Sequence, residues 1–291
     1  MTPDHRHARL AGFALGTCAA ACWGLAPVAT KASLGGFSPE VVSVIRLGAA
    51  ALCFRVLGGR DTRWLPRDGW SLLAGVALGI DFLFFNSGLR LTTAAVAGLL
   101  VNFGQVANVT LARLVLGEPL TARRLLGSAL TVAGVATVNT GGPDPGGGGG
   151  TLTGNILVML AAIAWSTYAV AQRRAPRTGN VFQLLAPIFH VAALVSAAAL
   201  IAPDAWHNPA GRTPGAMLAL LVGACTIAPY LLYSHGQELL DLVVMTVVLA
   251  STPVFAVVLA WLLLHEPIGW RMVAGGAVIL AGIVVVALER R

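Results

Sequence analysis

Three ionisable side chains lie inside long apolar stretches of the sequence, where a charge is costly and is usually kept for function. They are Arg46, Asp81 and His190. Arg46 and Asp81 are expected at similar depth on neighbouring segments. They form either a structural ion pair or a site that binds a carboxylate, an ammonium group or a proton. His190 is easily buried when neutral and titrates near neutral pH, so it is a packing residue or a proton-exchanging group.

Amide and aromatic side chains recur at helical spacing in three further apolar stretches, which places each set on one helix face. Such a face can line a site for an amphipathic small molecule, because Tyr combines an apolar ring with a hydroxyl. It can equally tie neighbouring helices together. The candidates are Asn102, Gln105 and Asn108; Trp165 and Tyr168; and Tyr230, Tyr233 and Gln237.

Sequence signals for other chemistries are missing. The four cysteines have no His or acid nearby in a metal-binding pattern, so they are expected to pack as small apolar residues. There is no Walker-type glycine loop, and no Ser or Cys stands beside a convincing His–acid pair. We therefore predict no catalytic residue, no metal and no cofactor. An intramembrane enzyme that acts on lipid head groups is kept as an alternative.

The composition sets the environment in which these groups must work. Hydrophobic residues make up 57% of the 291 residues and charged residues only 11%, whereas a soluble domain carries about 25% charged residues. The formal net charge is +7, but the basic residues lie in short loops without interleaved aromatic residues, which does not suit nucleic acid. The expected partners are the lipid bilayer and a small-molecule substrate.

The apolar stretches predict ten transmembrane helices, because each is close to the ~20 residues that cross a bilayer. They are expected at about residues 9–30, 39–57, 70–89, 92–116, 122–140, 152–172, 181–202, 214–236, 240–264 and 270–288. If the N-terminus is cytoplasmic, 14 of the 19 Lys and Arg residues lie on the cytoplasmic side and 4 on the other. The positive-inside rule thus predicts an inner (plasma) membrane protein with both termini in the cytoplasm.

The two halves of the sequence resemble each other. A shift of 148 residues aligns 79–138 with 227–286 without a gap, and "AACWGL" resembles "AIAWST" so that Trp23 corresponds to Trp165. Each half contains five predicted helices, an odd number, so the second half must enter the membrane upside down. The predicted fold class is an all-α membrane protein with two inverted five-helix repeats, an architecture of secondary transporters. Its parts are a first repeat at 1–140, a Gly/Pro-rich linker at 141–151 and a second repeat at 152–291.

Two Glu-Pro pairs close the fourth predicted helix of each half, because Pro cannot continue a helix and Glu must reach water. They are Glu118–Pro119 and Glu266–Pro267. The inversion places the two acids at opposite faces of the membrane. We therefore predict structural helix breaks, with Arg123 and Arg271 as ionic partners, and no shared acid site.

Several short motifs stand out along the chain. They are "CWG" at 22–24, "PEVVSVIR" ending at Arg46, "GEPLT" at 117–121 and "STPVFAVVLAWLLLHEP" at 251–267. Together they resemble motifs of the EamA branch of the drug/metabolite transporter superfamily. The resemblance implies a ten-helix transporter of small metabolites, often an exporter of amino acids or related compounds. Two positions depart from the family pattern, since Gln105 replaces a Pro and His265 replaces a Gly. The first lies in a helix expected to line the substrate cavity.

The combined prediction is a secondary transporter that moves a small polar or amphipathic, amino acid-like metabolite by alternating access, with export as the expected direction. The substrate would bind between the repeats, and a proton or substrate gradient would supply the energy. An importer of the same fold stays open, because topology does not fix the direction of flux. The chain is expected to act as a monomer or a homodimer.

Overall fold

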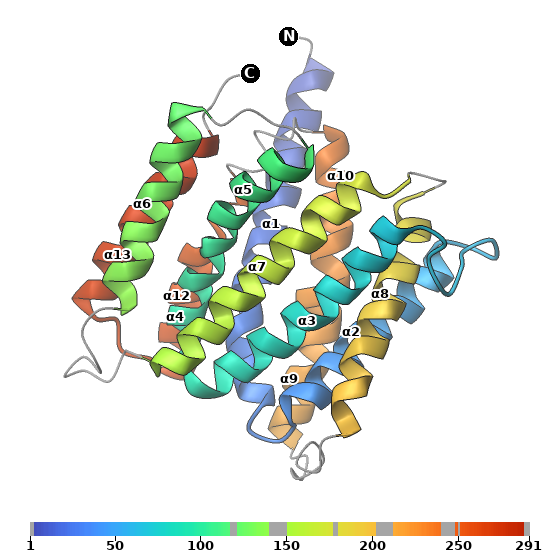
Figure 1. Ribbon diagram of the computed structural model, residues 1–291, viewed down its shortest axis with the longest axis horizontal. Helices are drawn as coiled ribbons and strands as arrows, with labels where there is room; N and C mark the ends of the chain where they lie inside the picture. Colours follow the sequence, from blue (N-terminus) through green and yellow to red (C-terminus); the bar gives the residue numbers. More distant parts are fainter. Residues whose placement is uncertain are drawn as a thin grey trace.

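The computed structural model describes residues 3–116, 121–139, 150–176, 180–201, 212–239, 248–249 and 251–287. Within these ranges the chain is helical and contains no strand. The helices run side by side, and the start of α1 lies at the same end of the molecule as the finish of α13 (Figure 1). An even number of membrane crossings would produce this arrangement.

Helices occupy each of the ten regions where the sequence predicts one. The first half contains α1 (Pro3–Ser33), α2 (Pro39–Leu57), α3 (Gly69–Leu91), α4 (Ala94–Leu100), a 3-10 turn (Val101–Phe103), α5 (Gly104–Leu116) and α6 (Ala122–Asn139). The second half contains α7 (Leu152–Arg174), α8 (Val181–Ala198), a 3-10 turn (Ala199–Ile201), α9 (Arg212–Val222), a π-helical turn (Gly223–Ile227), α10 (Ala228–Leu239), α12 (Thr252–Leu264) and α13 (Trp270–Ala287). The fourth helix of the first half is therefore broken, which the sequence did not predict.

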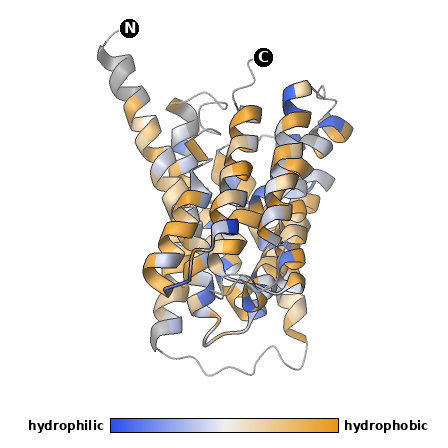
Figure 2. Cartoon of the chain, turned by 90° about the vertical axis from the view of Figure 1, so that its left-hand side faces the viewer, coloured by the Kyte–Doolittle hydropathy of each residue, from blue (hydrophilic) through white to orange (hydrophobic). Residues whose placement is uncertain are grey.

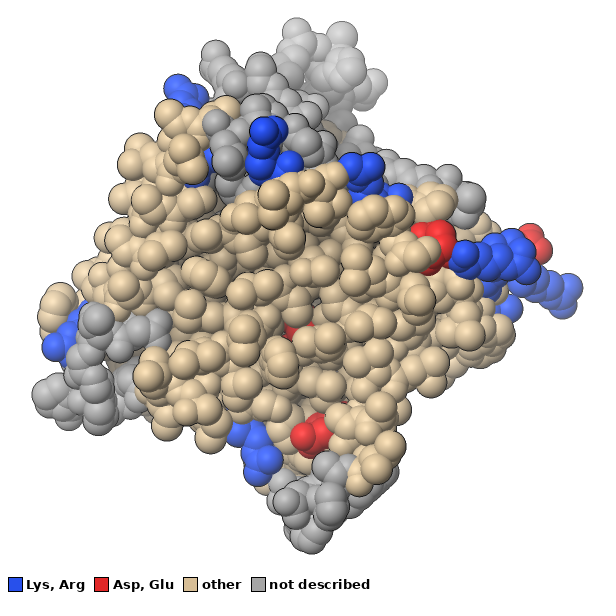
Figure 3. Space-filling view, viewed as in Figure 1, with Lys and Arg blue, Asp and Glu red and all other residues tan. Residues whose placement is uncertain are grey.

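Among the residues that the structure describes, five helical segments are long and apolar enough to cross a membrane. They are Leu10–Ser33, Gly69–Leu91, Leu152–Gln172, Val181–Ile201 and Pro214–Tyr233, and shorter apolar helices accompany them. Hydrophobic residues dominate the helices seen from the side (Figure 2). On the face in Figure 3 the charged side chains gather toward the edges, with only a small acidic patch near the middle. This distribution is that of a multi-pass membrane protein.

Side-chain caps begin several of these helices. Ser38, Asp68, Thr93, Thr151 and Asn180 each accept a hydrogen bond from a backbone N–H in the first turn of the helix that follows. Ser, Thr, Asp and Asn are the residue types that satisfy these otherwise unpaired donors. The chain therefore fixes where its helices begin with local chemistry.

The two halves contact each other in pairs related by the repeat. The third helix of each half packs on the first helix of the other, because α3 contacts α7 and α10 contacts α1. The second helices, α2 and α8, pack together, and so do the fifth helices, α6 and α13. The internal repeat of the sequence is thus matched by repeated helix contacts.

Glycines let α6 and α13 touch backbone to backbone. A Cβ atom on Gly134 would lie 2.6 Å from the carbonyl oxygen of Gly275, and one on Gly275 would lie 2.7 Å from that of Gly134. A Cβ on Gly282 would lie 2.5 Å from the carbonyl oxygen of Gly127. Small residues permit such close helix approach in membranes, so this contact depends on glycine at repeat-related positions.

Candidate functional site

Arg46 is buried where α2 meets the π-helical turn of the second half, and it is 6% exposed. Its Nε donates a hydrogen bond to Thr226 Oγ1 at 2.6 Å and its Nη2 donates one to the carbonyl of Cys225 at 3.1 Å. Its guanidinium carbon lies 4.7 Å from the centroid of the Phe82 ring. A π-helical turn shifts the backbone hydrogen bonds and is frequent at functional sites. Arg46 supplies a donor to a carbonyl of this turn.

Asp81 precedes Phe82 on α3 and keeps part of its surface exposed. It interacts electrostatically with Arg46, Tyr168 and Tyr230. Within the described ranges, however, no salt bridge or hydrogen bond joins it to another residue. The direct Arg46–Asp81 ion pair that the sequence suggested is therefore not formed, because the guanidinium bonds to the second half instead.

Aromatic rings from both halves gather beside these charges. The ring centroid of Trp23 lies 5.7 Å from that of Tyr230 and 5.6 Å from that of Tyr233, while Trp165 and Tyr168 are 5.1 Å apart. Tyr168 and Tyr230 are buried in one hydrophobic cluster, against which both tryptophans pack. The aromatic candidates of α7 and α10 thus come together. Trp23 was absent from the predicted site, although its correspondence to Trp165 was the signal for it.

Two close helix contacts flank this cluster and are related by the repeat. A Cβ atom on Gly24 of α1 would lie 3.0 Å from the carbonyl oxygen of Thr252 at the start of α12. In the other half, Ser166 of α7 donates a hydrogen bond at 2.8 Å to the carbonyl of Gly104 at the start of α5. The residue before Gly24 and the residue before Ser166 are the two tryptophans of the cluster. Repeat-related crossings therefore position both rings.

His190 contacts the connection between α2 and α3. Its Nδ1 lies 2.7 Å from the carbonyl oxygen of Ala186, and its Nε2 has no hydrogen-bond partner among the described residues. The ring of Trp64 meets it edge-on at 4.6 Å, and the guanidinium carbon of Arg55 lies 5.5 Å from that Trp64 ring. These contacts favour a packing role for His190.

Asn102 stabilises the break between α4 and α5. Its side-chain amide donates to the carbonyls of Gly98 and Leu99 at 3.2 and 3.1 Å, next to the 3-10 turn. The other two members of its predicted polar face, and three further predicted positions, lie outside the described side chains. They are Gln105, Asn108, Gln237, Glu118 and Pro119.

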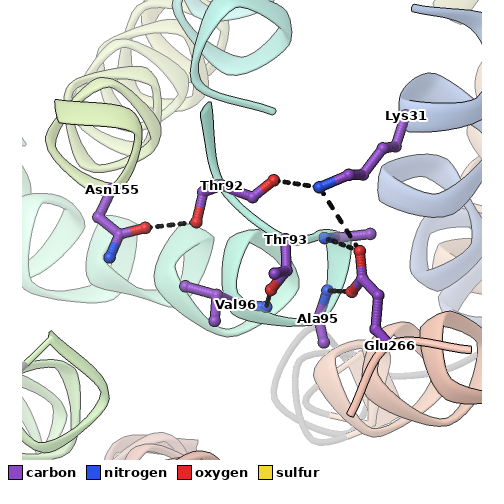
Figure 4. Close-up of polar contacts among 8 residues, drawn as sticks. Lys31, Thr92, Thr93, Ala95, Val96, Asn155 and Glu266 are labelled. Carbon is purple, nitrogen blue, oxygen red and sulfur yellow. Dashed lines mark hydrogen bonds and ion pairs between the residues drawn. The ribbon is translucent and has the colours of Figure 1, made fainter. Parts of the chain in front are cut away.

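Glu266 does not reach water as the sequence predicted, since it is only 9% exposed. Its two carboxylate oxygens accept hydrogen bonds from the backbone N–H groups of Ala94 and Ala95, both at 2.9 Å. Lys31 Nζ lies 3.6 Å from Oε1, and the close-up shows these groups converging (Figure 4). Glu266 and Pro267 still follow the end of α12 at Leu264, but the acid bonds to the first half of the chain.

His265 ends α12 in the left-handed region, with φ of 54°. Its backbone N–H donates to the carbonyl of Ala260. Glycine is favoured at such a position because a Cβ atom is strained there. This geometry would suit the Gly that the resemblance implies at this position better than the His that this chain carries.

The fold and these contacts define an all-α, multi-pass membrane protein with an internal repeat. The chain belongs to the EamA-like transporter family, whose model matches residues 10–140 and 152–288. The resemblance that the sequence motifs suggested is thereby confirmed.

Relatives cover most of the chain. An uncharacterized protein of Pseudomonas aeruginosa is 32% identical over 89% of this chain and 88% of its own length. The uncharacterized transporter YdfC of Bacillus subtilis is 24% identical over 90% and 86%. The aromatic amino acid exporter YddG of Ancylobacter novellus is 28% identical over 84% and 86%. A crystal structure covering 94% of this chain and 96% of its own, at 21% identity and a TM-score of 0.66, shares the fold.

Proposed function

We propose that the chain is a secondary transporter that exports a small amino acid-like metabolite across the inner (plasma) membrane by alternating access. The observation that carries this proposal is Asp81, a partly exposed residue whose carboxylate has no bonded partner among the described residues and lies beside aromatic rings from both halves. An amino acid offers an ammonium group to a carboxylate and a side chain to aromatic rings. A site made by both halves is where a rocking motion of repeats changes access.

The name of one relative supports the direction and the substrate class. YddG of Ancylobacter novellus is an aromatic amino acid exporter by name, and it is 28% identical to this chain. Trp23, Tyr230 and Tyr233 would give an aromatic substrate a face on which to stack. Import by the same fold is the second candidate, and membership of a transporter family favours either over a lipid head-group enzyme.

The test is counterflow of labelled solutes into proteoliposomes that contain the purified protein. Phenylalanine, tyrosine, tryptophan and alanine are compared, each with and without a pH gradient. We expect the aromatic amino acids to exchange faster than alanine, and a rate that follows the pH gradient would indicate proton coupling. If none of these solutes exchanges, the amino acid proposal is wrong.

Asp81→Asn tests the site itself. The variant keeps the size of the side chain and removes its charge. We expect the counterflow rate to fall ~10-fold or more, because this factor corresponds to the free energy of one hydrogen bond to a charged group. The matched control is Asp68→Asn on the same helix, because Asp68 only caps α3 through the N–H of Ser71 at 2.8 Å and Asn caps equally well. Wild-type exchange by Asp81→Asn would remove Asp81 from the substrate site.

A further inference from the structure

Four polar residues join the two halves of the chain, and the proposed substrate site makes no use of them. They are Lys31, Thr92, Asn155 and Glu266 (Figure 4). We propose that these four residues form a latch between the repeats, which holds one end of the transporter closed and opens in each transport cycle. The inference rests on the proposed alternating-access function.

The latch connects the halves through two separate links. Glu266, at the corner between α12 and α13, binds the start of α4 through two backbone N–H groups and pairs with Lys31 near the end of α1. Thr92, between α3 and α4, donates a hydrogen bond at 2.5 Å to Oδ1 of Asn155 in the first turn of α7. Lys31 also donates to the carbonyl of Thr92, so both links belong to one network.

All of these elements meet at one end of the molecule. The finish of α3, the start of α4 and the start of α7 lie at the end opposite to the start of α1 (Figure 1). Next to the latch, Thr151 donates its N–H and its hydroxyl to the carbonyl of Leu91 at 2.8 and 3.0 Å, which adds a further contact between the halves. Separation of the repeats at this end therefore requires the latch to break.

The chemistry of the latch suits a contact that opens. The side chain of Lys31 is 33% exposed and that of Glu266 is 10% exposed, so water already reaches the cation. In the closed state the carboxylate is compensated by two N–H groups and an ammonium. In an open state water would hydrate both charges, so neither is left buried and unpaired. At the glycine crossing of α6 and α13, by contrast, the backbones themselves approach closely, which suits a permanent joint.

Glu266→Gln tests the latch, because Gln keeps the shape and one oxygen acceptor but removes the charge. The readout is labelling of Cys22 by a membrane-impermeant maleimide, with the other cysteines replaced. Cys22 is half-buried on α1 beside Trp23. We expect the labelling rate of Cys22 to rise ~10-fold in right-side-out vesicles. The reason is that loss of a charge-assisted hydrogen bond from the closed state increases the fraction of molecules in the open state by about this factor. Inside-out vesicles are measured in parallel, and an increase in either preparation supports the latch and reports its face.

The matched control is Asp68→Asn, which alters another carboxylate that bonds to backbone N–H but stays within the first half. It should label like the parent protein. Should Glu266→Gln fail to fold, Lys31→Gln removes only the partly exposed cation and should raise labelling in the same direction. If Cys22 is labelled at the parent rate in the variant that folds, whatever the melting temperature of that variant, these residues only stabilise the fold. That result would overturn the latch proposal.

Labelling needs no substrate, so it separates this inference from the proposed function. If wild-type protein exchanges no amino acid and Glu266→Gln still raises labelling, the substrate proposal fails and the latch stands. If amino acids exchange normally and labelling does not change, the latch fails and the substrate proposal stands.

Discussion

Arg46 is the residue whose role changes most between sequence and structure. A buried arginine seven residues into α2 suggested an ion pair with Asp81. Its donors instead reach Thr226 and the carbonyl of Cys225 on the second half of the chain. Arg46 therefore holds the π-helical turn against α2, while Asp81 makes no hydrogen bond or salt bridge among the described residues. Under the proposed function, Asp81 would be the charged group that meets the substrate.

Replacement of Arg46 by lysine tests this division. An ammonium cannot reproduce the planar fork that reaches two acceptors and stacks on Phe82. We expect Arg46→Lys to lower the free energy of unfolding by about 1–3 kcal/mol, measured by thermal unfolding in detergent. Thr226→Val removes one acceptor, and the double variant should lose less than the sum of the two single variants. Strict additivity would show that Arg46 and Thr226 act independently.

At the scale of helices, the crossing of α6 and α13 depends on the absence of side chains. A Cβ atom on Gly134 would lie 2.6 Å from the carbonyl oxygen of Gly275 and 2.7 Å from a side-chain carbon of Ile279. We expect Gly134→Ala to lower the free energy of unfolding by about 1–3 kcal/mol, because the added carbon overpacks the crossing. Gly48→Ala is the control, because nothing lies within 4 Å of the added carbon. In a helix that change should stabilise by roughly 0.5–1 kcal/mol. Equal effects of the two changes would contradict the close crossing.

At the end of α12, a single substitution is expected to increase the stability of the protein. His265 holds a left-handed conformation with φ of 54°, which costs an L-residue with a Cβ atom roughly 1–2 kcal/mol. We expect His265→Gly to raise the melting temperature, because glycine adopts this conformation without that strain. His265→Ala keeps the Cβ atom and should give no gain. A lower melting temperature for His265→Gly would mean that the imidazole makes a contact worth more than the strain.

At the scale of the whole molecule, the sequence predicted properties that depend on length and local chemistry. The ten helical regions followed from the lengths of the apolar stretches, and the internal repeat followed from the aligned halves. The 3-10 break at Val101–Phe103 and the π-helical turn were not predicted, because contacts with other helices decide them. The partners of Glu266 lie 171 and 172 residues away. An acid before a proline gives no local signal of such distant backbone N–H groups.

The orientation of the molecule is the last property that the sequence predicts. The connection between α2 and α3 carries three arginines within residues 58–68, whereas the turn between α1 and α2 carries none. The positive-inside rule therefore places the first connection in the cytoplasm and the second outside. Asp61→Cys and Gly35→Cys, both at exposed positions, test this in a cysteine-free background. In intact cells we expect an impermeant maleimide to label Gly35→Cys alone, and Asp61→Cys only after permeabilisation. The reverse pattern would invert the topology and place the Glu266 latch on the cytoplasmic face.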